Sequence, residues 1–481
     1  MKLFNLLVGC VLVAPAALAS TYDAVIVGGG LSGLSAAKEL VSKNKTYVVL
    51  EARDRVGGRV YNKPLQHQDG VVEVGAEFVG PTQDVVLALA KELGLSTFST
   101  YNKGDNILWQ NNKLKTFPAD GLLGAVSPED PITLLQISQL QSELDKYAKK
   151  IDINAPWDFE KAEEFDAKSV QDWINEHHVT KATKEILTLA LAEIFSAAPA
   201  DLSLLYVIFY VASGGAPGNP GTMERFTQVK DGAQMYRIEG GTGLLPENLA
   251  KKLGKHNIRL NSPVSSIERA GKNTNDTYTV TTRSGKKYEG KHVIVAMSPP
   301  MADKISFSPS LPHARQRIQK KLKMGSIGKG IGIYKEPFWR KKKYSGQVLS
   351  DDFAVRASFD STPKDKSFGA MMGFIQDEQM RALDGASEEE QEEAVGSALR
   401  HYFGAEAEQV SEWVFMRWDN EEYSGGGPTA NAPVGVLSKY GKALREPVGN
   451  LHWAGTESAD YWVGYMDGAL RSGKRAASEI K

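Results

Sequence analysis

The sequence predicts an α/β protein in which a doubly wound parallel sheet, built from separated segments, joins a second domain with a mixed sheet and helices. Three observations predict this fold. A strand–helix–strand unit lies near the start, a long helical stretch covers about residues 100–220, and strand patterns return after it. Because crossover connections bring such strands side by side in one sheet, the interrupted order indicates a discontinuous domain.

The first unit begins with the apolar, β-branched run Ala24–Val27, which is typical of a buried parallel strand. Helical periodicity follows over Leu31–Leu40, and Tyr47–Leu50 is a second short strand. Glycines in G-x-G-x-x-G spacing stand between the first strand and the helix. This order is the fingerprint of a Rossmann-like dinucleotide site, and an ordinary β-α-β turn is the alternative interpretation.

Each glycine of this fingerprint, and the acid that follows it, has a physical role. Gly28 allows the tight turn, Gly30 lets the backbone approach a pyrophosphate, and Gly33 lets the helix pack on the strand. The positive helix N-terminus then faces the phosphates. Glu51 ends the second strand, where its carboxylate can accept hydrogen bonds from a ribose, but it does not distinguish FAD from NAD. The predicted cofactor-binding residues of this unit are Gly28, Gly30, Leu31, Ser32, Gly33 and Glu51.

Composition restricts the class of protein. The 481 residues are enough for two or three domains, and 42% hydrophobic with 24% charged residues is typical of a soluble globular protein. A net charge of −1 argues against a nucleic-acid-binding protein, because such proteins normally carry an excess of basic residues. We expect no metal site.

Residues 1–19 resemble a secretory signal peptide. Lys2 precedes the apolar run Leu3–Val13, and Ala17-Leu18-Ala19 is a typical cleavage signal. We therefore expect a secreted or secretory-pathway protein; an uncleaved anchor or a buried helix is the alternative. Cys10, the single cysteine, lies in this segment, so the mature chain would have no disulfide. Asn44 and Asn275 begin glycosylation sequons that matter only in that pathway.

The remaining elements are predicted from periodicity and turn residues. The run 204–211 is apolar nearly all round, which indicates a buried helix. The basic run Arg340–Lys343 is interpreted as a solvated loop, and Ser387 as the cap of an acidic helix start. The other expected helices are Pro131–Ile151, Lys181–Phe195 and Leu202–Ala212, and the expected strands are Ile258–Val264, Tyr278–Arg283, Lys287–Gly290, Val293–Ala296 and Ser326–Tyr334.

Several motifs together identify a family resemblance. The stretch that ends in Arg55-Val56-Gly57-Gly58-Arg59 resembles the E-A-R-x-R-x-G-G-R motif of FAD-dependent amine oxidases; a basic surface turn is the alternative. V-G-A-E-F-V-G-P-T-Q at 74–83, Y-K-E-P-F-W at 334–339, S-G-G at 424–426 and A-G-T-E…W-V-G-Y-M at 454–466 follow in order. The chain is thus similar to the flavin-containing monoamine oxidases over most of its length, which implies FAD as the cofactor.

The resemblance also implies roles for single residues. Lys329 matches the lysine that holds a water near flavin N5, and an unpaired lysine is costly to bury, although a solvent-facing lysine is the alternative. Tyr465 matches one wall of an aromatic cage that orients the amine, and it could instead be a core residue. The further residues that the resemblance places at FAD are Arg53, Gly58, Arg59, Ala76, Glu77, Val264, Trp418, Gly455, Glu457, Tyr465 and Met466.

Two departures from the family pattern bear on cofactor and substrate. Gly427 stands where monoamine oxidases carry the cysteine that bonds the flavin, so we expect non-covalent FAD; attachment through a histidine stays open. Pro428 replaces the second cage tyrosine, which leaves one aromatic wall in the substrate pocket and puts small arylalkylamines in doubt. The chain also ends without a hydrophobic tail, so no stable membrane anchor is expected.

The sequence thus predicts an FAD-dependent amine oxidase that converts an amine to an imine and reduces O2 to H2O2. One alternative is an FAD-dependent dehydrogenase or oxidocyclase for a bulky amine-bearing metabolite, which Pro428 favours. Another is a flavin-fold binding protein without turnover; a nicotinamide-dependent enzyme is least favoured. The substrate and the oligomeric state stay open. The expected units are a signal peptide (1–19), an FAD-binding domain (20–80, 222–300 and 447–481) and a substrate-binding domain (81–221 and 301–446).

Overall fold

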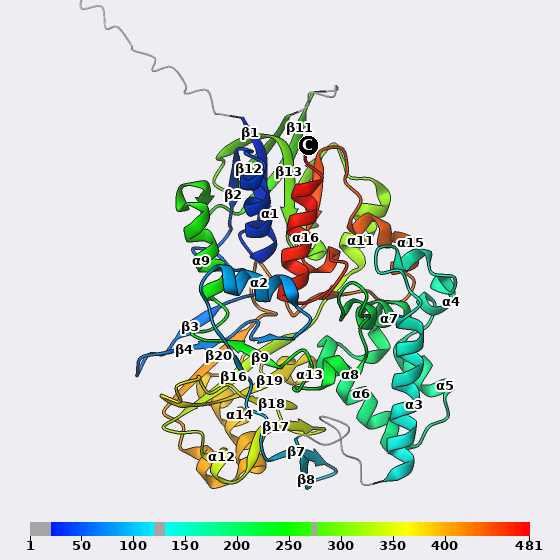
Figure 1. Cartoon of the computed structure of the whole chain (residues 1–481), viewed down its shortest axis with the longest axis vertical. Coiled ribbons are helices and arrows are strands. Elements are labelled where there is room, and N and C mark those ends of the chain that lie inside the picture. Colours follow the sequence, from blue (N-terminus) through cyan, green and yellow to red (C-terminus); the bar gives the residue numbers. More distant parts are fainter. Residues whose placement is uncertain (1–20, 120–129, 272–276) are drawn as a thin grey trace, which may run out of the picture.

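The computed structural model describes residues 21–119, 130–271 and 277–481. The predicted signal peptide, Cys10 and the Asn275 sequon position lie outside these described residues. One sheet with helices over it forms the upper part of Figure 1, a second sheet forms the lower part, and a group of helices lies beside them. In the described part of the chain, no helix is both long and apolar enough to cross a membrane.

The first sheet collects strands from the beginning, the middle and the end of the chain. Its order is β10-β2-β1-β13-β12-β11-β14, and β22 also pairs with β13. The pairs among β10, β2, β1, β13 and β22 are parallel, whereas β11, β12 and β13 form an antiparallel meander. The strands are β1 (Tyr22–Val27), β2 (Tyr47–Leu50), β10 (Ile258–Arg259), β11 (Val264–Ala270), β12 (Thr277–Thr282), β13 (Lys287–Ala296), β14 (Ser306–Ser308) and β22 (Leu451–Ala454).

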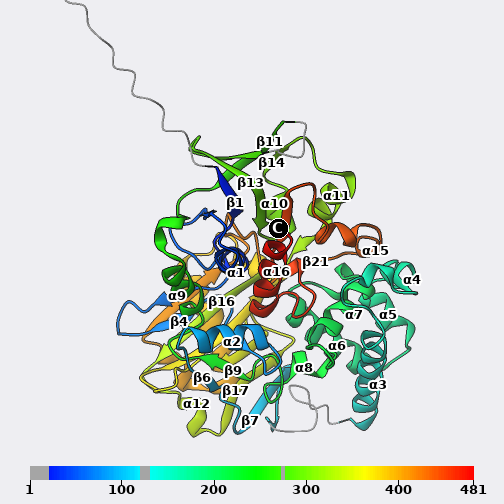
Figure 2. The ribbon, with the colours of Figure 1, turned by 45° about the horizontal axis from the view of Figure 1, so that its top comes forward.

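Two helices that are far apart in sequence pack together over this sheet. Helix α1 (Leu31–Ser42) follows β1, and α16 (Met466–Ser478) is the last helix of the chain. They lie side by side in Figures 1 and 2, in blue and red. The Ser35 hydroxyl donates to the Leu470 carbonyl oxygen at 2.7 Å. At Gly473, a Cβ would lie 1.9 Å from the Ser32 carbonyl oxygen, so only glycine permits this close contact.

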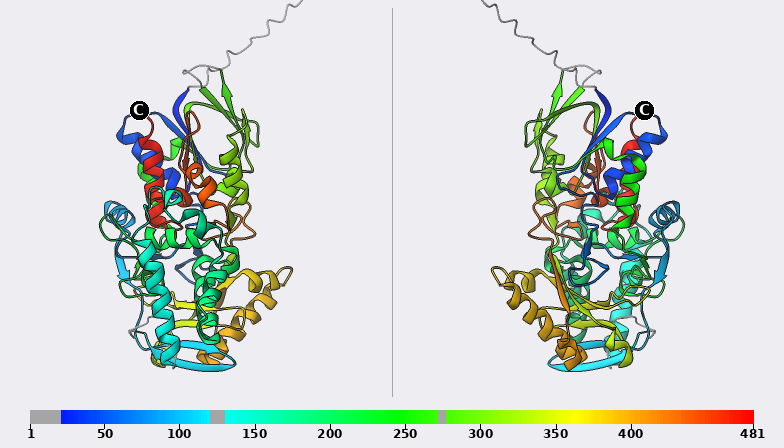
Figure 3. Two further views of the ribbon diagram at one scale, coloured as in Figure 1. Left: turned by 90° about the vertical axis from the view of Figure 1, so that its right-hand side faces the viewer. Right: turned by 90° about the vertical axis from the view of Figure 1, so that its left-hand side faces the viewer.

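The second sheet has the order β20-β16-β19-β18-β17-β7-β8 and is mixed, because β17 and β7 run parallel while their neighbours run antiparallel. Helix α14 (Glu388–Phe403) covers one face of it (Figure 3). Ser387 is the N-cap of this helix, as the sequence predicts, and the structure shows that it forms a capping box with Glu390. The strands are β7 (Asp105–Gln110), β8 (Lys113–Pro118), β16 (Ile327–Tyr334), β17 (Tyr344–Ser350), β18 (Ala357–Asp360), β19 (Gly369–Gln376) and β20 (Glu412–Arg417).

A helical layer closes the molecule beside the two sheets. Helix α7 (Leu204–Ser213) is buried along its whole length, which confirms the prediction from its all-round apolar pattern. Around it lie α3 (Pro131–Ala148), α4 (Ala162–Asp166), α5 (Val170–Glu176), α6 (Lys181–Phe195) and α8 (Glu224–Thr227). The other helices are α2 (Asp84–Glu92), α9 (Leu244–Leu253), α10 (Pro299–Ala302), α11 (His313–Lys321), α12 (Phe338–Lys341), α13 (Asp377–Ala382) and α15 (Leu437–Tyr440).

Short strand pairs connect these layers. Strand β9 (Tyr236–Ile238) lies between β5 (Phe78–Val79) and β6 (Thr97–Ser99). Arg237 therefore pairs with Phe78 on one side and with Phe98 on the other. The remaining pairs are β3 (Asn62–Pro64) with β4 (Val71–Glu73) and β15 (Lys323–Met324) with β21 (Ala430–Asn431).

Three element predictions differ from the structure. The expected strand 258–264 is broken, because Asn261 has a left-handed backbone (φ 51°) and the chain turns to bond the segment after β2. The two expected strands 287–290 and 293–296 are one continuous strand, β13. Arg340 does not lie in a solvated loop: it is in α12, and its guanidinium is paired with the buried Asp360.

Candidate active site

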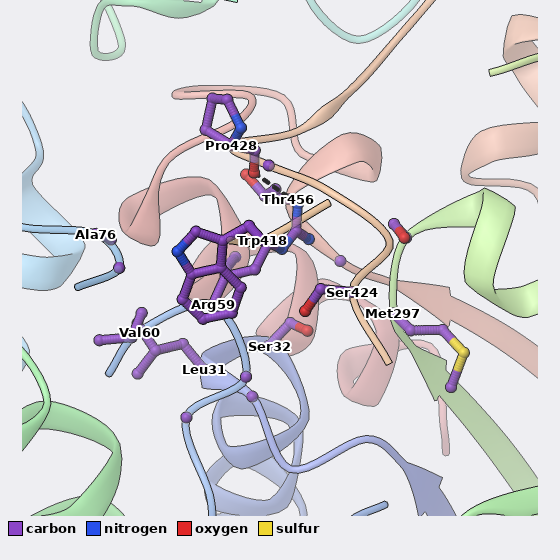
Figure 4. A pocket seen from close by; sticks show the side chains of 18 of the residues that line it. Leu31, Ser32, Arg59, Val60, Ala76, Met297, Trp418, Ser424, Pro428 and Thr456 are labelled. Atoms are coloured by element: carbon purple, nitrogen blue, oxygen red, sulfur yellow. Dashed lines mark hydrogen bonds between the residues drawn. The ribbon is translucent and has the colours of Figure 1, made fainter. Parts of the chain in front are cut away.

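A cavity of about 360 Å³ lies where the two sheets meet, and it brings together residues from every segment with a predicted site. Two predicted residues, Gly33 and Glu457, are not in its wall. The predicted residues that line it are Gly28, Gly30, Leu31, Ser32, Glu51, Arg53, Gly58, Arg59, Ala76, Glu77, Val264, Lys329, Trp418, Pro428, Gly455, Tyr465 and Met466. Figure 4 shows part of this wall.

The glycine loop after β1 has the shape of a phosphate cradle. Gly28 has φ +109°, and a Cβ there would lie 2.5 Å from the Ala296 carbonyl oxygen. A Cβ on Gly33 would lie 1.9 Å from the Gly28 carbonyl oxygen, so this glycine packs α1 against the strand turn. At Gly30, by contrast, the nearest atom to a Cβ is 3.8 Å away, so the missing side chain leaves room that opens on the cavity.

The first turn of α1 offers the donors that a pyrophosphate requires. Gly30 is the N-cap of α1, and no side chain caps the helix. The backbone N–H groups of a helix N-terminus need acceptors, and the helix dipole favours an anion there. An open glycine cradle beside such donors fits the diphosphate of a dinucleotide.

Glu51 lies buried at the end of β2 and faces the same cavity. Its Oε2 accepts from the Gly29 backbone N–H at 2.6 Å, and its Oε1 accepts from the Arg53 N–H at 2.9 Å. Each carboxylate oxygen has a further lone pair, so the group both fixes the glycine loop and can accept from a sugar hydroxyl.

Two arginines follow, and each is held by an acid. Arg53 donates to Glu421 at 2.9 Å and to the Ser424 hydroxyl at 2.8 Å. Arg59 donates to the Pro428 carbonyl oxygen at 2.6 Å and to Glu457 Oε1 at 2.8 Å; the first of these bonds is visible in Figure 4. Glu457 thus does not line the cavity. It lies behind Arg59 and holds the Arg59 guanidinium in place.

The indole of Trp418 borders the middle of the cavity (Figure 4). Its Nε1–H donates to the Val74 carbonyl oxygen at 2.8 Å, which fixes the ring beside the segment that carries Ala76. Gly75 leaves room for the ring, since a Cβ there would lie 3.1 Å from Trp418 Cζ2 and 2.2 Å from the Arg59 carbonyl oxygen. Gly455, with φ +122°, and Met466, the first residue of α16, also line the cavity.

Lys329 is buried on β16, with 4% of its side chain exposed, and faces the cavity. Its Nζ donates to the Glu73 carbonyl oxygen at 2.9 Å and to Glu77 Oε2 at 2.8 Å. Because an ammonium has three N–H donors, one donor is left for a water or a ligand. Lys329 therefore is neither a solvent-facing lysine nor an unpaired buried charge.

The lysine belongs to a buried group of four charges, two acidic and two basic. Arg237 Nη2 lies 2.7 Å from Glu73 Oε2, and its Nε lies 3.1 Å from Glu77 Oε1. Burial would raise the pKa of Glu77, but the charges of Lys329 and Arg237 outweigh it and hold that pKa below its ordinary value. Burial instead raises the pKa of Glu73, although Arg237 opposes this. The four charges sum to zero.

Tyr465 lies in the wall of the cavity and belongs to a group of aromatic side chains. Its ring centroid is 4.9 Å from that of Trp462, 6.0 Å from Phe226 and 6.2 Å from Tyr210. Burial raises the pKa of the Tyr465 hydroxyl, so it stays a neutral donor. Phe359 and Phe374 also line the cavity. This wall can exclude water from an apolar ligand.

Sequence reasoning missed several residues of the wall. Glu193, Ser196 and Gln234 line the cavity, and each carries a buried polar atom without a hydrogen-bond partner. Glu193 left a signal that could have been followed, because it is an acid in the otherwise apolar run 189–195. Ser196 and Gln234 left none, because both lie in turns, where no periodicity indicates the direction that a side chain faces.

Comparisons with known proteins agree with this geometry. The family profile described as flavin containing amine oxidoreductase matches residues 31–481. The flavin-containing amine oxidase A of Sus scrofa is 37% identical over 461 residues, covering 95% of this chain and 84% of its own. The structure of cyclohexylamine oxidase from Brevibacterium oxydans IH-35A matches with a TM-score of 0.88 and 29% identity, over 96% of this chain and 99% of its own. Putrescine oxidase bound to putrescine matches with a TM-score of 0.88 and 28% identity over the same shares.

Proposed function

This chain belongs to the flavin-containing amine oxidoreductases and is an FAD-dependent enzyme of amine oxidation; from that premise we propose that it is an oxidase that uses dioxygen and holds FAD without a covalent bond. One observation carries the proposal: a phosphate cradle, a buried lysine with a free donor and an aromatic wall share one cavity. The substrate would be an amine whose C–N bond is oxidised to an imine, with H2O2 as the second product.

Bound FAD supplies the two-electron acceptor for this oxidation. The chain's own residues would bind and orient. The α1 N-terminus and Gly30 would hold the diphosphate, and Glu51 would accept from the ribose. Lys329 would hold a water through its remaining N–H, with Glu77 fixing the ammonium in place. Tyr465 and its aromatic neighbours would exclude water and orient a neutral amine.

The wall of the cavity supports a non-covalent cofactor. Among the described residues that line it there is neither a cysteine nor a histidine, the two kinds of attachment considered from the sequence. Gly427, at the position that resembles the cysteine site of monoamine oxidases, is itself in the wall. Precipitating the purified protein with acid should leave the yellow flavin in the supernatant; flavin that stays with the pellet would contradict this assignment.

A panel of amines scored for peroxide release tests the oxidase function. We expect substrate-dependent H2O2 formation, and slower reoxidation of the reduced cofactor by O2 in K329M. A reoxidation rate that is unchanged in K329M would remove the proposed role of Lys329. The control is K364M, since Lys364 pairs with Glu239 at the surface, where both side chains are about half exposed.

Pro428 in the wall favours a second candidate, a dehydrogenase or oxidocyclase for a bulky amine-bearing metabolite. Such an enzyme would reduce its cofactor with large cyclic amines and leave simple alkylamines unchanged, and product masses would show ring closure instead of imine hydrolysis. A flavin-fold binding protein without turnover would bind FAD that no amine bleaches under argon.

We also propose that the protein enters the secretory pathway. Residues 1–19 have the pattern of a cleaved leader, and the Asn44 sequon lies on an exposed turn after α1. Expression in a eukaryotic secretion host should give a mature chain that begins at Ser20. Retention of residues 1–19 in the isolated protein would reject this proposal.

A further inference from the structure

Glu193 is an acid in the wall of the cavity that the proposed mechanism does not use. It stands near the end of α6, between the buried residues Leu191 and Phe195. Its Oε2 is buried and has no hydrogen-bond partner. Because an unpaired buried polar atom costs about 1–3 kcal/mol, a donor supplied by a ligand would remove a penalty that the chain alone leaves in place.

The chain also leaves the Glu193 carboxyl without a directly paired cation. Among the described residues, no cation forms an ion pair with this carboxylate. Arg356 attracts it through space, but the Arg356 guanidinium contacts the side-chain amide of Gln379 at 2.6 Å. Burial raises the pKa of the Glu193 carboxyl to about 8 despite Arg356. A cationic ligand would favour the ionised form.

Two further polar atoms in the same wall lack partners. The Ser196 hydroxyl and the Gln234 amide oxygen are both buried and unbonded. A carboxylate, a hydroxyl and an amide oxygen all accept hydrogen bonds, and an ammonium offers three N–H donors and a positive charge. The three groups therefore match the chemistry of a protonated amine.

Glu193 and Lys329 line the same cavity, but they lie at different places in its wall. The Gln376 amide donates to the Glu193 backbone oxygen at 3.1 Å, and Gln376 pairs in register with Ile327. Ile327 precedes Lys329 by two positions on β16, a step of about 7 Å along a strand. Phe359 and Phe374 line the cavity as well and offer an apolar surface for a methylene chain.

We propose that Glu193 binds a second, positively charged amino group of the substrate, so that this enzyme acts on aliphatic diamines or polyamines. The inference rests on the proposed oxidation of an amine and specifies its substrate class. The two ends of one molecule would meet different surroundings: a neutral amino group beside the Lys329 donor and an ammonium beside the Glu193 carboxylate. This difference would orient the substrate.

The test compares 1,3- to 1,6-diaminoalkanes with the n-alkylamines of equal length. In the wild-type holoenzyme, kcat/KM for the best diamine should exceed that of its monoamine by about 10- to 150-fold, the effect of one hydrogen bond between charged groups. In E193Q the ratio should fall to within about threefold of unity. E185Q is the matched control, because Glu185 lies on the same helix with 42% of its side chain exposed, and the preference should persist.

A thermal-shift titration with the same amines measures binding without turnover. E193L, which suits the apolar neighbours on α6, replaces E193Q if that variant does not retain FAD. A diamine preference that is absent in the wild type, or unchanged in both variants, would overturn the assignment of Glu193 and leave amine oxidation intact. A different outcome would reject the oxidase proposal and keep the Glu193 site. In that case diamines would stabilise the wild type but not E193Q, and no amine would give peroxide.

Discussion

The buried charge group around Lys329 gives a quantitative prediction. In K329M, Glu73 and Glu77 would share Arg237 alone, which leaves one negative charge without compensation. Removing one partner of a buried ion pair costs about 3–5 kcal/mol of unfolding free energy. In K329M/E77Q the remaining Glu73 and Arg237 balance each other. The double variant should therefore be more stable than K329M by about 1–3 kcal/mol, although it carries one more substitution.

The measurement is a double-mutant cycle by urea unfolding at a fixed excess of FAD. The matched control is the surface pair of Lys364 and Glu239, 2.8 Å apart with both side chains about half exposed, whose coupling should stay below about 1 kcal/mol. The deficit of K329M should also shrink at low pH, because a proton on Glu73 or Glu77 removes the excess charge. If the losses of the two single variants simply add in the double variant, the four residues do not act as one neutral group.

Three further predictions follow from named contacts. G30A should weaken FAD binding while leaving the flavin-free protein nearly as stable, since its Cβ would have no atom nearer than the Gly57 carbonyl oxygen at 3.8 Å. G33A should destabilise the fold because its Cβ would lie 1.9 Å from the Gly28 carbonyl oxygen; FAD titration and urea unfolding separate the two effects. G473A should destabilise the protein because its Cβ would lie 1.9 Å from the Ser32 carbonyl oxygen. G396A, in helix α14 with the nearest atom to its Cβ at 3.5 Å, should be neutral or stabilising by up to about 1 kcal/mol. Equal losses of stability in both variants would show that helix propensity, not the α1–α16 contact, determines the effect. The pKa of Glu193 is raised in the folded protein from its ordinary 4.5 to about 8, so its contribution to stability is present below about pH 4.5 and is lost as the pH rises to 8. E193Q should remove this part of the pH dependence of the unfolding free energy. Parallel pH profiles for the wild type and E193Q would refute this prediction.

Local patterns were sufficient to predict the parts of the fold that depend on neighbouring residues. The unit β1–α1–β2 and the buried helix α7 follow from periodicity and glycine spacing, and the structure has them nearly at the predicted bounds. The broken strand at 258–264 left a signal in Asn261 and Pro263, which are typical of turns. Strand β13 resembles two strands in the sequence because Lys291 and His292 separate Lys287–Gly290 from the apolar run Val293–Ala296.

The groups that depend on distant contacts could not be predicted in this way. Glu73 and Arg237 are 164 positions apart, and nothing near either residue indicates its partner. Lys329 was singled out through resemblance, but its bond to Glu77 becomes visible only when β16 lies beside the segment after β4. Glu193 differs from a surface acid only by the direction it faces, which depends on how α6 packs against the second sheet.

The contact between α1 and α16 has a consequence for how the protein is made. Ser35 and Leu470 are bonded across 435 positions, so the ribosome must finish nearly the whole polypeptide before the nucleotide fold can close. At about 5–20 residues per second, this delay is roughly 20 to 90 seconds. During that time the first strand and helix emerge without their final neighbours, and their apolar faces are available to chaperones. Loading of the cofactor would then be one of the last events of biogenesis.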